Sequence, residues 1–521
     1  MRNEMSDETF YLTTPIYYIN DVPHVGHAYT TIAADFIARF RRLEGRRVHL
    51  LTGTDEHGER IMRTAEAHGV SPREWADGIV PRWTEVWAAL DIANDDFVRT
   101  TEPRHEQPVQ AFVQALYDGG HIYLGSYEGL YCVGCEAFKT PDELVDGKCP
   151  LHGTEPSLVK EENYFFRLSD YAQRLIDLYD SESGFVLPEA RRNEVLGKVR
   201  QGLDDLSISR LSFDWGVPIP WDSKHVIYVW IDALLNYITA VGYGVDEDRF
   251  SRLWPADVHL MAKDILWFHA VIWPAMLMAL DLPLPKTVFA HGYLQVGGEK
   301  MSKSRMTGIS PHDLLPTFGS DGIRYYLMRE VSFGLDGNFS WESMVARYNS
   351  DLANDFGNLV SRVLTMIGRY LEGRIPQAPS PAELQPSDDA LRRAFDDSLA
   401  GMRRAVDEVA PHDALKAAWE FVRKANAYVE EVTPWKLAKE EAGRRRLEVV
   451  LYELADALRL MALMISPIAP RATQELWSRL GLEGSVAHRT LPSDGRWELL
   501  VEGAEVTTGA PLFPRLEEPA R

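Results

Sequence analysis

The sequence lacks the features of membrane and secreted proteins. Its strongest hydrophobic run, 265–280, has 16 residues and is interrupted by His269 and Pro274. A helix that crosses a bilayer needs ~20 apolar residues. The first ten residues, MRNEMSDETF, contain acids and no apolar run, so they do not form a signal peptide. We therefore expect a cytoplasmic protein with no membrane partner, in which 265–280 is a buried helix.

Positive charge is also scarce. The 521 residues include 55 Lys and Arg against 77 Asp and Glu, a formal net charge of −22. So acidic a chain cannot bind nucleic acid through its overall charge, and any such partner requires a local basic patch. The 45% hydrophobic and 25% charged content is typical of a folded globular protein, and the length predicts several domains.

Cysteine is nearly absent, since the chain has only Cys132, Cys135 and Cys149. An odd and clustered set excludes a disulfide framework and favours a reducing compartment. Two residues separate Cys132 from Cys135 and Cys149 from His152, and two such pairs suit one tetrahedral zinc ion. Because protein would fill all four positions, the zinc is expected to be structural. The alternative is three buried thiols and an unrelated histidine.

The order of apolar segments predicts an α/β domain followed by helices. Up to about residue 125, strands (FYLTTPI, RVHLLTG, FVRTT) alternate with helical stretches at 26–43, 59–68 and 72–90. This alternation is typical of a parallel sheet covered by helices. Aromatic, hairpin-like segments follow to about 225, and the alternation resumes with VIYVWI, VHLMA and TVFAHG. After about 340 the pattern is helical to 480, which predicts a helix bundle. The last forty residues are irregular, and their packing stays open.

The first motif with a chemical role is His24-Val25-Gly26-His27, directly after the first strand. Histidines three residues apart on the first turn of a helix share one face. A helix N-terminus already attracts anions, and imidazole N–H groups add donors for phosphate. Gly26 would let a base or phosphate approach the backbone. The alternative is a pair of capping or core histidines.

The second motif is the loop 297–304, GGEKMSKS, which follows the strand TVFAHG. Its two glycines allow tight turns. Lys300 and Lys303 provide point charges for a polyphosphate, and Ser302 provides a hydrogen-bond donor. The alternative is a solvated loop.

Together, HVGH and KMSKS resemble the signature pair of class I aminoacyl-tRNA synthetases. Four further blocks resemble the methionyl-tRNA synthetase family: TTPIYYINDVPHVGHAYT, LTGTDEHGERI, VWIDALLNYITAVG and KDILWFHAVIWPAML. The resemblance implies that methionine and ATP form methionyl-adenylate, and that the methionyl group then passes to the 2′-OH of the terminal adenosine of methionine tRNAs, initiator and elongator. Mg²⁺ would accompany ATP. Synthetases for Ile, Val or Leu share both motifs, but their editing insertion is larger than 100–225 allows.

The resemblance also implies a division of the chain. The chain would begin with an α/β, Rossmann-type catalytic domain in two halves, 1–102 and 226–293. A zinc-knuckle insertion at 103–225 would separate the halves. A KMSKS-loop linking domain follows at 294–355, and an all-α anticodon-binding helix bundle with a C-terminal tail at 356–521. Many relatives extend further with a C-terminal dimerising module. This sequence stops after LFPRLEEPAR, soon after the bundle, so we expect a monomer.

Site residues carried over from the family fall into five groups. Catalytic roles are implied for His24, His27, Lys300, Lys303 and Arg210. ATP would contact His24, Gly26, His27, Asp264, Lys300, Ser302 and Lys303. Methionine would contact Pro15, Ile16, Tyr18, Asp55, Trp230, Leu234, Tyr237, Ile265, His269 and Trp273, although some relatives have Pro in place of Leu234. Asn358, Arg362 and Trp435 would read the anticodon. Cys132, Cys135, Cys149 and His152 would bind zinc, although many relatives have a fourth Cys at His152.

Three other classes of protein fit the sequence less well. Cysteinyl enzymes place a zinc site in the catalytic cleft, whereas these cysteines lie in the insertion. A catalytically silent tRNA-binding relative has no need for two intact phosphate motifs. A zinc-bearing nucleic-acid module explains neither motif.

Overall fold

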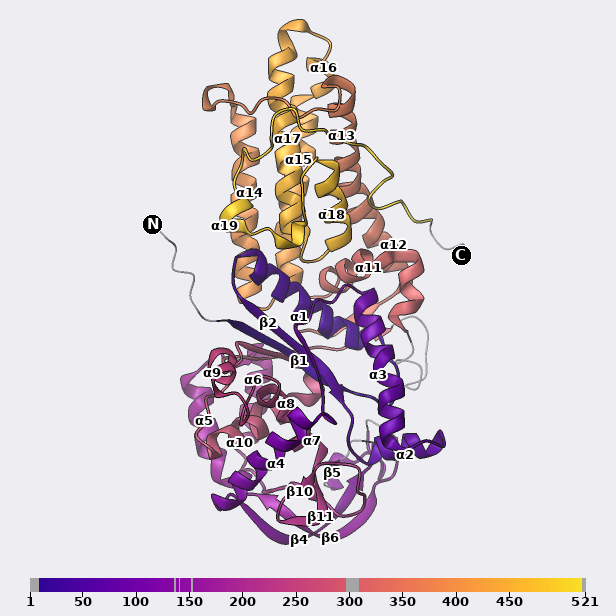
Figure 1. Cartoon of the computed structure of the whole chain (residues 1–521), viewed down its shortest axis with the longest axis vertical. Helices are drawn as coiled ribbons and strands as arrows, with labels where there is room; N and C mark the ends of the chain where they lie inside the picture. Colours follow the sequence, from indigo (N-terminus) through magenta and orange to yellow (C-terminus); the bar gives the residue numbers. More distant parts are fainter. Residues whose placement is uncertain (1–8, 135–136, 140, 151–152, 297–308, 518–521) are drawn as a thin grey trace.

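The computed structural model describes residues 9–134, 137–139, 141–150, 153–296 and 309–517. Figure 1 shows an α/β part at the bottom and a long helical bundle at the top, joined by a smaller helical region. Predicted zinc ligands Cys135 and His152 and the motif residues Lys300, Ser302 and Lys303 lie outside the described residues.

The centre of the α/β part is a parallel sheet of six strands in the order β3-β2-β1-β12-β13-β7. Strand order reverses between β1 and β12, and open α/β sheets bind ligands at the carboxyl ends of the strands beside such a reversal. The strands are β1 (Phe10–Tyr18), β2 (Val48–Asp55), β3 (Asp96–Arg99), β7 (Val186–Leu187), β12 (Val258–Ala262) and β13 (Val288–His291). The predicted α/β class and parallel sheet are therefore confirmed.

Helices cover this sheet with apolar faces. In α1, which runs through the centre of the molecule, the buried residues include Ile32, Phe36 and Phe40 at helical spacing. The helix α3 begins where Ser71 and Glu74 cap each other's backbone N–H groups, as expected for Ser followed three residues later by Glu. The helices of this layer are α1 (Val25–Leu43), α2 (Glu59–Ala67), α3 (Pro72–Ala89) and α4 (Pro103–Asp118).

The aromatic segments after α4 form two antiparallel sheets at the bottom of Figure 1. The larger has β5 (Ala137–Lys139), β4 (Ile122–Cys132), β6 (Ser157–Phe166) and β8 (Leu206–Ser207), and the smaller has β10 (Pro218–Ile219), β11 (Asp222–Ile227) and β9 (Ser209–Arg210). Between the strands lie η1 (Pro141–Glu143), η2 (Leu168–Tyr171), α5 (Ala172–Ser181) and α6 (Glu189–Val199).

The segment VIYVWI differs from the expected parallel strand. It leaves β11 after Ile227 and begins the short helix α7 (Val229–Leu234), because a short apolar run does not distinguish a strand from a buried helix. The edge strand next to β13 is instead β7, which lies within the predicted insertion 103–225. Helices α8 (Asn236–Thr239) and α9 (Glu247–Leu253) then lead to β12.

The run 265–280 is helical, as expected. It consists of η3 (Lys263–Ile265), a wider π-type turn η4 (Phe268–Ile272) and α10 (Trp273–Ala279). Throughout the described ranges, no helix combines the length and the apolar character that a membrane span requires.

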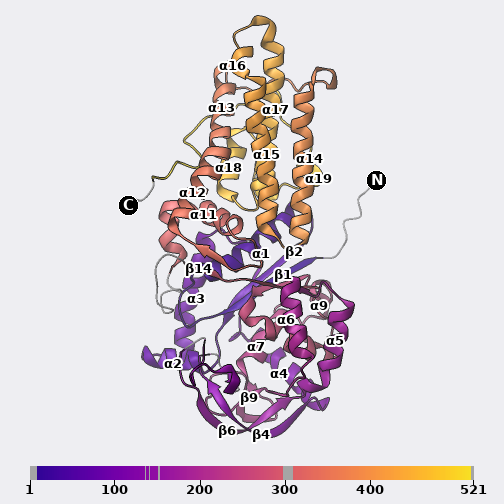
Figure 2. The same cartoon turned by 180° about the vertical axis from the view of Figure 1, so that it is seen from behind.

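The upper part begins with a linking region. It contains the parallel pair β14 (Leu294–Val296) and β15 (Gly337–Phe339), α11 (Pro311–Arg329), α12 (Trp341–Arg347) and η5 (Tyr348–Gly357). The bundle follows, seen from both sides in Figures 1 and 2. It contains α13 (Asn358–Tyr370), η6 (Pro381–Glu383), α14 (Pro386–Asp407), α15 (Pro411–Val432), α16 (Pro434–Leu437), η7 (Glu441–Gly443), α17 (Arg444–Ile465), α18 (Pro470–Arg479), η8 (Val486–His488) and α19 (Leu491–Asp494).

The C-terminal segment packs along the bundle. Ile375 N–H donates to Ala504 O at 3.0 Å, and Val506 N–H donates to Gly373 O at 2.7 Å. Further along, the buried Phe513 ring contacts the rings of Tyr348 and Phe356. The segment is therefore part of the folded body.

A buried guanidinium joins helix α1 of the α/β part to the bundle. Arg324 on α11 is fully buried and donates to Asp35 Oδ2 on α1 at 2.5 Å. It also donates to Leu90 O and, in the turn between α17 and α18, to Pro467 O and Ile468 O, at 2.8–3.1 Å. Burial alone would raise the pKa of Asp35, yet the guanidinium groups of Arg39 and Arg324 hold this pKa below its ordinary value. The ion pair thus persists at neutral pH.

Substitution of Arg324 by Ala should destabilise the folded chain strongly. It would leave Asp35 with less charge compensation and three buried carbonyls without donors, at a cost of about 3–5 kcal/mol. Arg471, which pairs with Asp91 at 2.7 Å and whose side chain is 61% exposed, provides the control, because exposed pairs contribute about 0–1 kcal/mol. Urea unfolding followed by tryptophan fluorescence measures both. Equal losses in the two variants would contradict the role of Arg324.

Candidate functional site

The predicted site residues of the α/β part gather at one edge of the parallel sheet. Tyr18 and Asp55 are the last residues of β1 and β2 and face each other in the sheet register. Asp264 follows the end of β12, and β13 ends at His291. Because β1 and β12 flank the reversal of strand order, these side chains border the crevice where such sheets bind nucleotides.

His24 and His27 form a closed cap at the start of α1. Nδ1 of His24 accepts from Gly26 N–H at 3.0 Å, and Nδ1 of His27 accepts from His24 N–H at 3.2 Å. The two rings stack with their centroids 3.7 Å apart. Burial lowers the pKa of both histidines, so both rings are neutral at pH 7. Since each Nδ1 is an acceptor, each Nε2 carries the proton, and the pair offers two neutral N–H donors.

Gly26 is required by its neighbour and not only by a ligand. A Cβ at this position would lie 2.9 Å from Cε1 and 3.0 Å from Nδ1 of His24. Any larger residue would therefore push the His24 ring away from the backbone N–H that it caps. The sequence indicated the need for glycine, but the structure supplies a different reason.

The second motif is flanked by described residues that return to the first. The described chain stops at Val296 in β14 and resumes at residue 309. Val25 N–H, inside the HVGH motif, donates to Ile309 O at 3.0 Å. Ile309, five positions after the end of the predicted loop 297–304, thus contacts the start of α1, so the C-terminal flank of the second motif lies beside the first motif.

A buried chain of hydrogen bonds joins three residues of the predicted methionine pocket. Tyr237 O–H bonds to His269 Nε2 at 2.7 Å, and His269 Nδ1 bonds to Ile265 O at 2.9 Å. Because Nδ1 faces a carbonyl, it carries the proton and Nε2 accepts. Burial lowers the pKa of His269 to about 4, so the ring is neutral. The network fixes both aromatic side chains in one orientation.

Aromatic packing surrounds this chain. Trp230 stacks on Phe268 with centroids 3.9 Å apart and planes 8° apart. Trp273 is fully buried, contacts the Tyr237 ring, and donates from Nε1 to His259 at 3.2 Å. Of the remaining predicted residues, Pro15 and Leu234 are buried, and Ile16 and Tyr18 are partly exposed at the end of β1.

Sequence reasoning missed two residues that directly follow Asp55, namely Glu56 and His57. Asp55 itself is only 8% exposed. Glu56 is fully buried and accepts from Arg99 Nε at 2.7 Å and from the hydroxyl groups of Thr54 and Thr101 at 2.6 Å. His57 bonds to Asp232 on α7. The available signal was three titratable residues in a row, Asp-Glu-His, directly after a buried strand.

Asp264 and Arg210 lie in different surroundings. Asp264 lines a cavity of about 400 Å³ together with cationic and aromatic side chains, among them Arg191, Lys198, Lys263 and Tyr293. Arg210 is buried on β9, donates to Ser209 O at 2.7 Å and lies over the Tyr228 ring at 4.1 Å.

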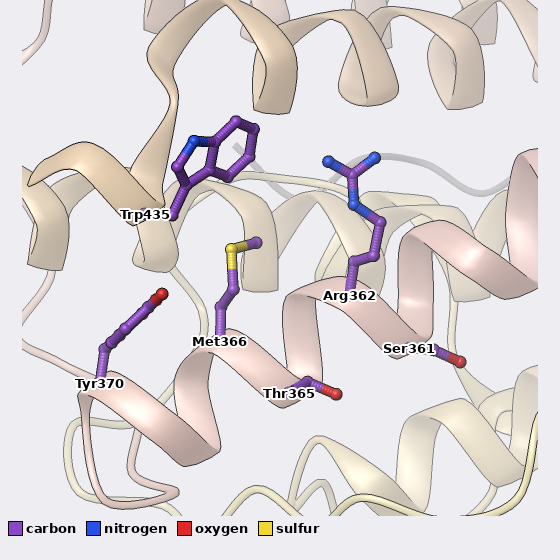
Figure 3. Close-up of a pocket in the computed structure, with 6 residues that line it drawn as sticks. All are labelled: Ser361, Arg362, Thr365, Met366, Tyr370 and Trp435. Atoms are coloured by element: carbon purple, nitrogen blue, oxygen red, sulfur yellow. The ribbon is translucent and has the colours of Figure 1, made fainter. Parts of the chain in front are cut away.

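A second site lies far away, on the bundle. A cavity of about 400 Å³ is lined by Ser361, Arg362, Thr365, Met366, Tyr370 and Trp435. Figure 3 shows Arg362 and Trp435 projecting into the same space on either side of Met366. Arg362 also donates to Glu430 at 2.6 Å. The third predicted reader, Asn358, is exposed one helical turn before Arg362 but does not line the cavity.

Only two of the four predicted zinc ligands are described. Cys132, at the end of β4, and Cys149 are both 1% exposed. Gly153 N–H donates to Cys149 O at 2.7 Å. Among the described side chains, no three His, Cys, Asp or Glu residues form a metal-binding group. Buried thiols are soft ligands that fit a divalent metal such as zinc.

Comparison with known proteins identifies the family. The family model described as "tRNA synthetases class I (M)" matches residues 10–155 and 135–364, and the model "Anticodon-binding domain of tRNA ligase" matches 388–508. Methionine–tRNA ligase of Streptomyces coelicolor is 53% identical over 98% of this chain and 97% of the relative. That of Caldanaerobacter subterraneus subsp. tengcongensis is 49% identical over 98% of this chain and 79% of the relative.

A solved structure agrees with the sequence relatives. The methionyl-tRNA synthetase of Mycobacterium tuberculosis in complex with methionyl-adenylate is 42% identical, with a TM-score of 0.92 over 98% of this chain and 100% of that chain. The sheet with its reversed strand order, the paired histidines and the appended bundle are thus accounted for together: the chain belongs to the methionyl-tRNA synthetase family of class I aminoacyl-tRNA synthetases.

Proposed function

We propose that the chain ligates methionine to its tRNAs, initiator and elongator, through methionyl-adenylate. The observation that carries this proposal is that both strands beside the reversal of the parallel sheet lead to candidate residues. Strand β1 leads into the His24–His27 pair and pairs with β2 at Asp55. His259 of β12 contacts the ring of Tyr237, which bonds to His269. One part offers donors for phosphate, and the other offers a carboxylate and an apolar pocket for an amino acid.

In the first step, a carboxylate oxygen of methionine bonds to the α-phosphorus of ATP, and the bond to the pyrophosphate oxygen breaks. No protein nucleophile is required, so catalysis consists of positioning and electrostatic stabilisation. His24 and His27 donate from Nε2 to the phosphate oxygens. Lys300, Ser302 and Lys303 would bind the departing pyrophosphate, and Mg²⁺ would neutralise the phosphates of ATP.

The remaining pocket residues hold the two substrates. Asp55 accepts from the methionine ammonium in a charge-assisted hydrogen bond, and the thioether packs on the aromatic rings, which sulfur favours. The walls are Pro15, Ile16, Tyr18, Trp230, Leu234, Tyr237, Ile265, His269 and Trp273. Asp264 and Gly26 contact ATP. Arg210 interacts with a carboxylate or phosphate, which suits a planar guanidinium.

In the second step, the terminal adenosine 2′-OH of tRNA attacks the methionyl carbonyl and AMP leaves. The anticodon is recognised at the bundle cavity of Figure 3, where Trp435 provides a stacking surface and Arg362 provides donors for base edges. Asn358, exposed one helical turn before Arg362, provides a further donor outside the cavity lining. Binding there requires Arg362 to leave or share its partner Glu430.

Four predictions from the sequence complete the proposal. One structural zinc binds Cys132, Cys135, Cys149 and His152, supported by the burial of the two described cysteines. The chain works as a monomer. It is located in the cytoplasm. Its domains divide at the boundaries given above, although strand β7 from the predicted insertion 103–225 also pairs with the catalytic sheet.

Amino-acid-dependent ATP–pyrophosphate exchange, measured with each of the twenty amino acids and without tRNA, tests the function. Exchange with methionine alone is expected, because the proposed pocket fits methionine. The assay can omit tRNA because adenylate formation does not need it. Exchange with another amino acid would keep the mechanism and overturn the specificity. Absence of exchange from folded, zinc-loaded protein would overturn the activity.

The pH dependence of exchange tests the neutral state of the two histidines. Burial lowers the pKa of His24 and His27, so the neutral rings, whose Nδ1 atoms accept the cap hydrogen bonds, gain a proton only as the pH falls below these lowered values. At saturating substrates the rate should therefore stay constant from pH 8 to about 6.5, the ordinary histidine pKa. A half-maximal rate at that pH would show that a ring with an ordinary pKa controls the reaction.

The variant Trp435→Ala tests the bundle site. Loss of one stacked base should lower kcat/KM for tRNA about 10- to 100-fold, while tRNA-independent exchange is unchanged. Trp435→Phe keeps an aromatic plane and should retain most of the activity. If exchange and aminoacylation fall in parallel, Trp435 acts on folding and not on the anticodon.

A further inference from the structure

A buried carboxylate with two histidine partners lies beside the proposed methionine pocket. Asp232 Oδ2 bonds to His57 Nδ1 at 2.7 Å, and Asp232 Oδ1 bonds to His105 Nε2 at 2.9 Å. The side chains of Asp232, His57 and His105 are 1%, 4% and 0% exposed. None of the three belongs to the predicted site, and the proposed mechanism does not use them.

The polarity of the network follows from its partners. Burial alone would raise the pKa of Asp232, but the two histidines lower it to about 2. An ionised carboxylate only accepts, so His57 donates from Nδ1 and His105 donates from Nε2. The opposite nitrogens face other groups: His105 Nδ1 bonds to Thr239 Oγ1 at 2.7 Å, and His57 Nε2 lies 3.7 Å from Glu106 Oε1.

Each member comes from a different element that borders the pocket. His57 follows Asp55 by two residues after β2, and His105 lies on α4. Asp232 lies on the six-residue helix α7, between Trp230 and Leu234, and no side chain caps the N-terminus of this helix. So short a helix is not stable by itself. Side-chain contacts must therefore fix its position relative to Asp55, and the two histidine bonds are strong, charge-assisted examples.

We propose that His57 and His105 are positioning residues for methionine: through Asp232, they hold Trp230 and Leu234 on α7 at a fixed distance from Asp55. The ammonium and the thioether of one substrate molecule then find their partners simultaneously, without an added cost of ordering the pocket. The inference rests on the proposed function, because it assigns Asp55 and α7 to the two ends of methionine. ATP binds at α1 and does not depend on this network.

Asparagine and glutamine substitutions separate hydrogen bonding from packing. An Asn side chain places its amide where histidine has Nδ1, and a Gln side chain places it where histidine has Nε2. His57→Asn and His105→Gln therefore keep a donor for Asp232. His57→Gln and His105→Asn aim the amide at Glu106 and Thr239 and leave Asp232 with one partner fewer.

The experiment measures KM for methionine, KM for ATP and kcat by pyrophosphate exchange in all four variants of the full chain. We expect His57→Gln and His105→Asn to raise KM for methionine about tenfold, the effect of one lost bond to a buried charge. KM for ATP and kcat should change less than about twofold. His57→Asn and His105→Gln should stay within about twofold of the parent for all three constants.

The decisive result is that Asn is the better substitute for His57 whereas Gln is the better substitute for His105. If the histidines only fill space, Gln is the better substitute at both positions because its volume is closer to that of His, and such a ranking would overturn the proposal. A parallel rise of both KM values would overturn it as well. Should His105→Asn fail to fold, the His57 pair decides alone, since His57 lies nearer the surface beside Glu106, whose side chain is 38% exposed. If the parent chain shows no methionine-dependent exchange, the proposed function itself fails.

Discussion

The ion pair between Arg324 and Asp35 is the interaction on which the rest of the structure depends. The guanidinium is fully buried and its hydrogen bonds reach α1, the end of α3 and the turn between α17 and α18. It therefore connects the helix that carries His24 and His27 to the bundle that carries Trp435. Burying a charge is costly unless it is paired and hydrogen-bonded, and four acceptors take four of the five guanidinium N–H groups of Arg324. The relative orientation of the two candidate sites is set by this polar contact as well as by apolar packing.

The order of strands explains why the candidate site residues gather at one edge of the sheet. Because β1 lies between β2 and β12 in the parallel sheet, Asp264 reaches the same edge as Tyr18 and Asp55, although it lies more than two hundred residues after both in the sequence. Around this edge, buried polar networks fix the orientation of side chains together with aromatic packing. The Tyr237–His269 pair, the Glu56–Arg99 pair and the Asp232 network are examples.

Much of this arrangement was predictable from the sequence, and the exceptions have physical causes. Alternating strands and helices predicted β1, α1, β2 and β12, because their hydrophobic periods are clear. The prediction of a parallel strand at VIYVWI was wrong, because an apolar run of six residues fits a strand and a helix equally well. The network of Asp232 was invisible because its three members lie far apart in sequence, at 57, 105 and 232. The reason for Gly26 was also hidden, since it depends on the ring of His24 turning back onto its own helix.

The closed cap formed by His24 and His27 has a consequence for how the site is lost. Every atom of this cap comes from four consecutive residues, so it forms whenever the first turn of α1 forms. The amino-acid pocket needs segments around 55, 105, 232 and 269 to be in place together. Proteins open locally in separate cooperative units, so an arrangement that depends on several segments is lost when any one of them opens. A chain under thermal or chemical stress would then keep the proposed phosphate donors in place after the proposed amino-acid pocket has come apart.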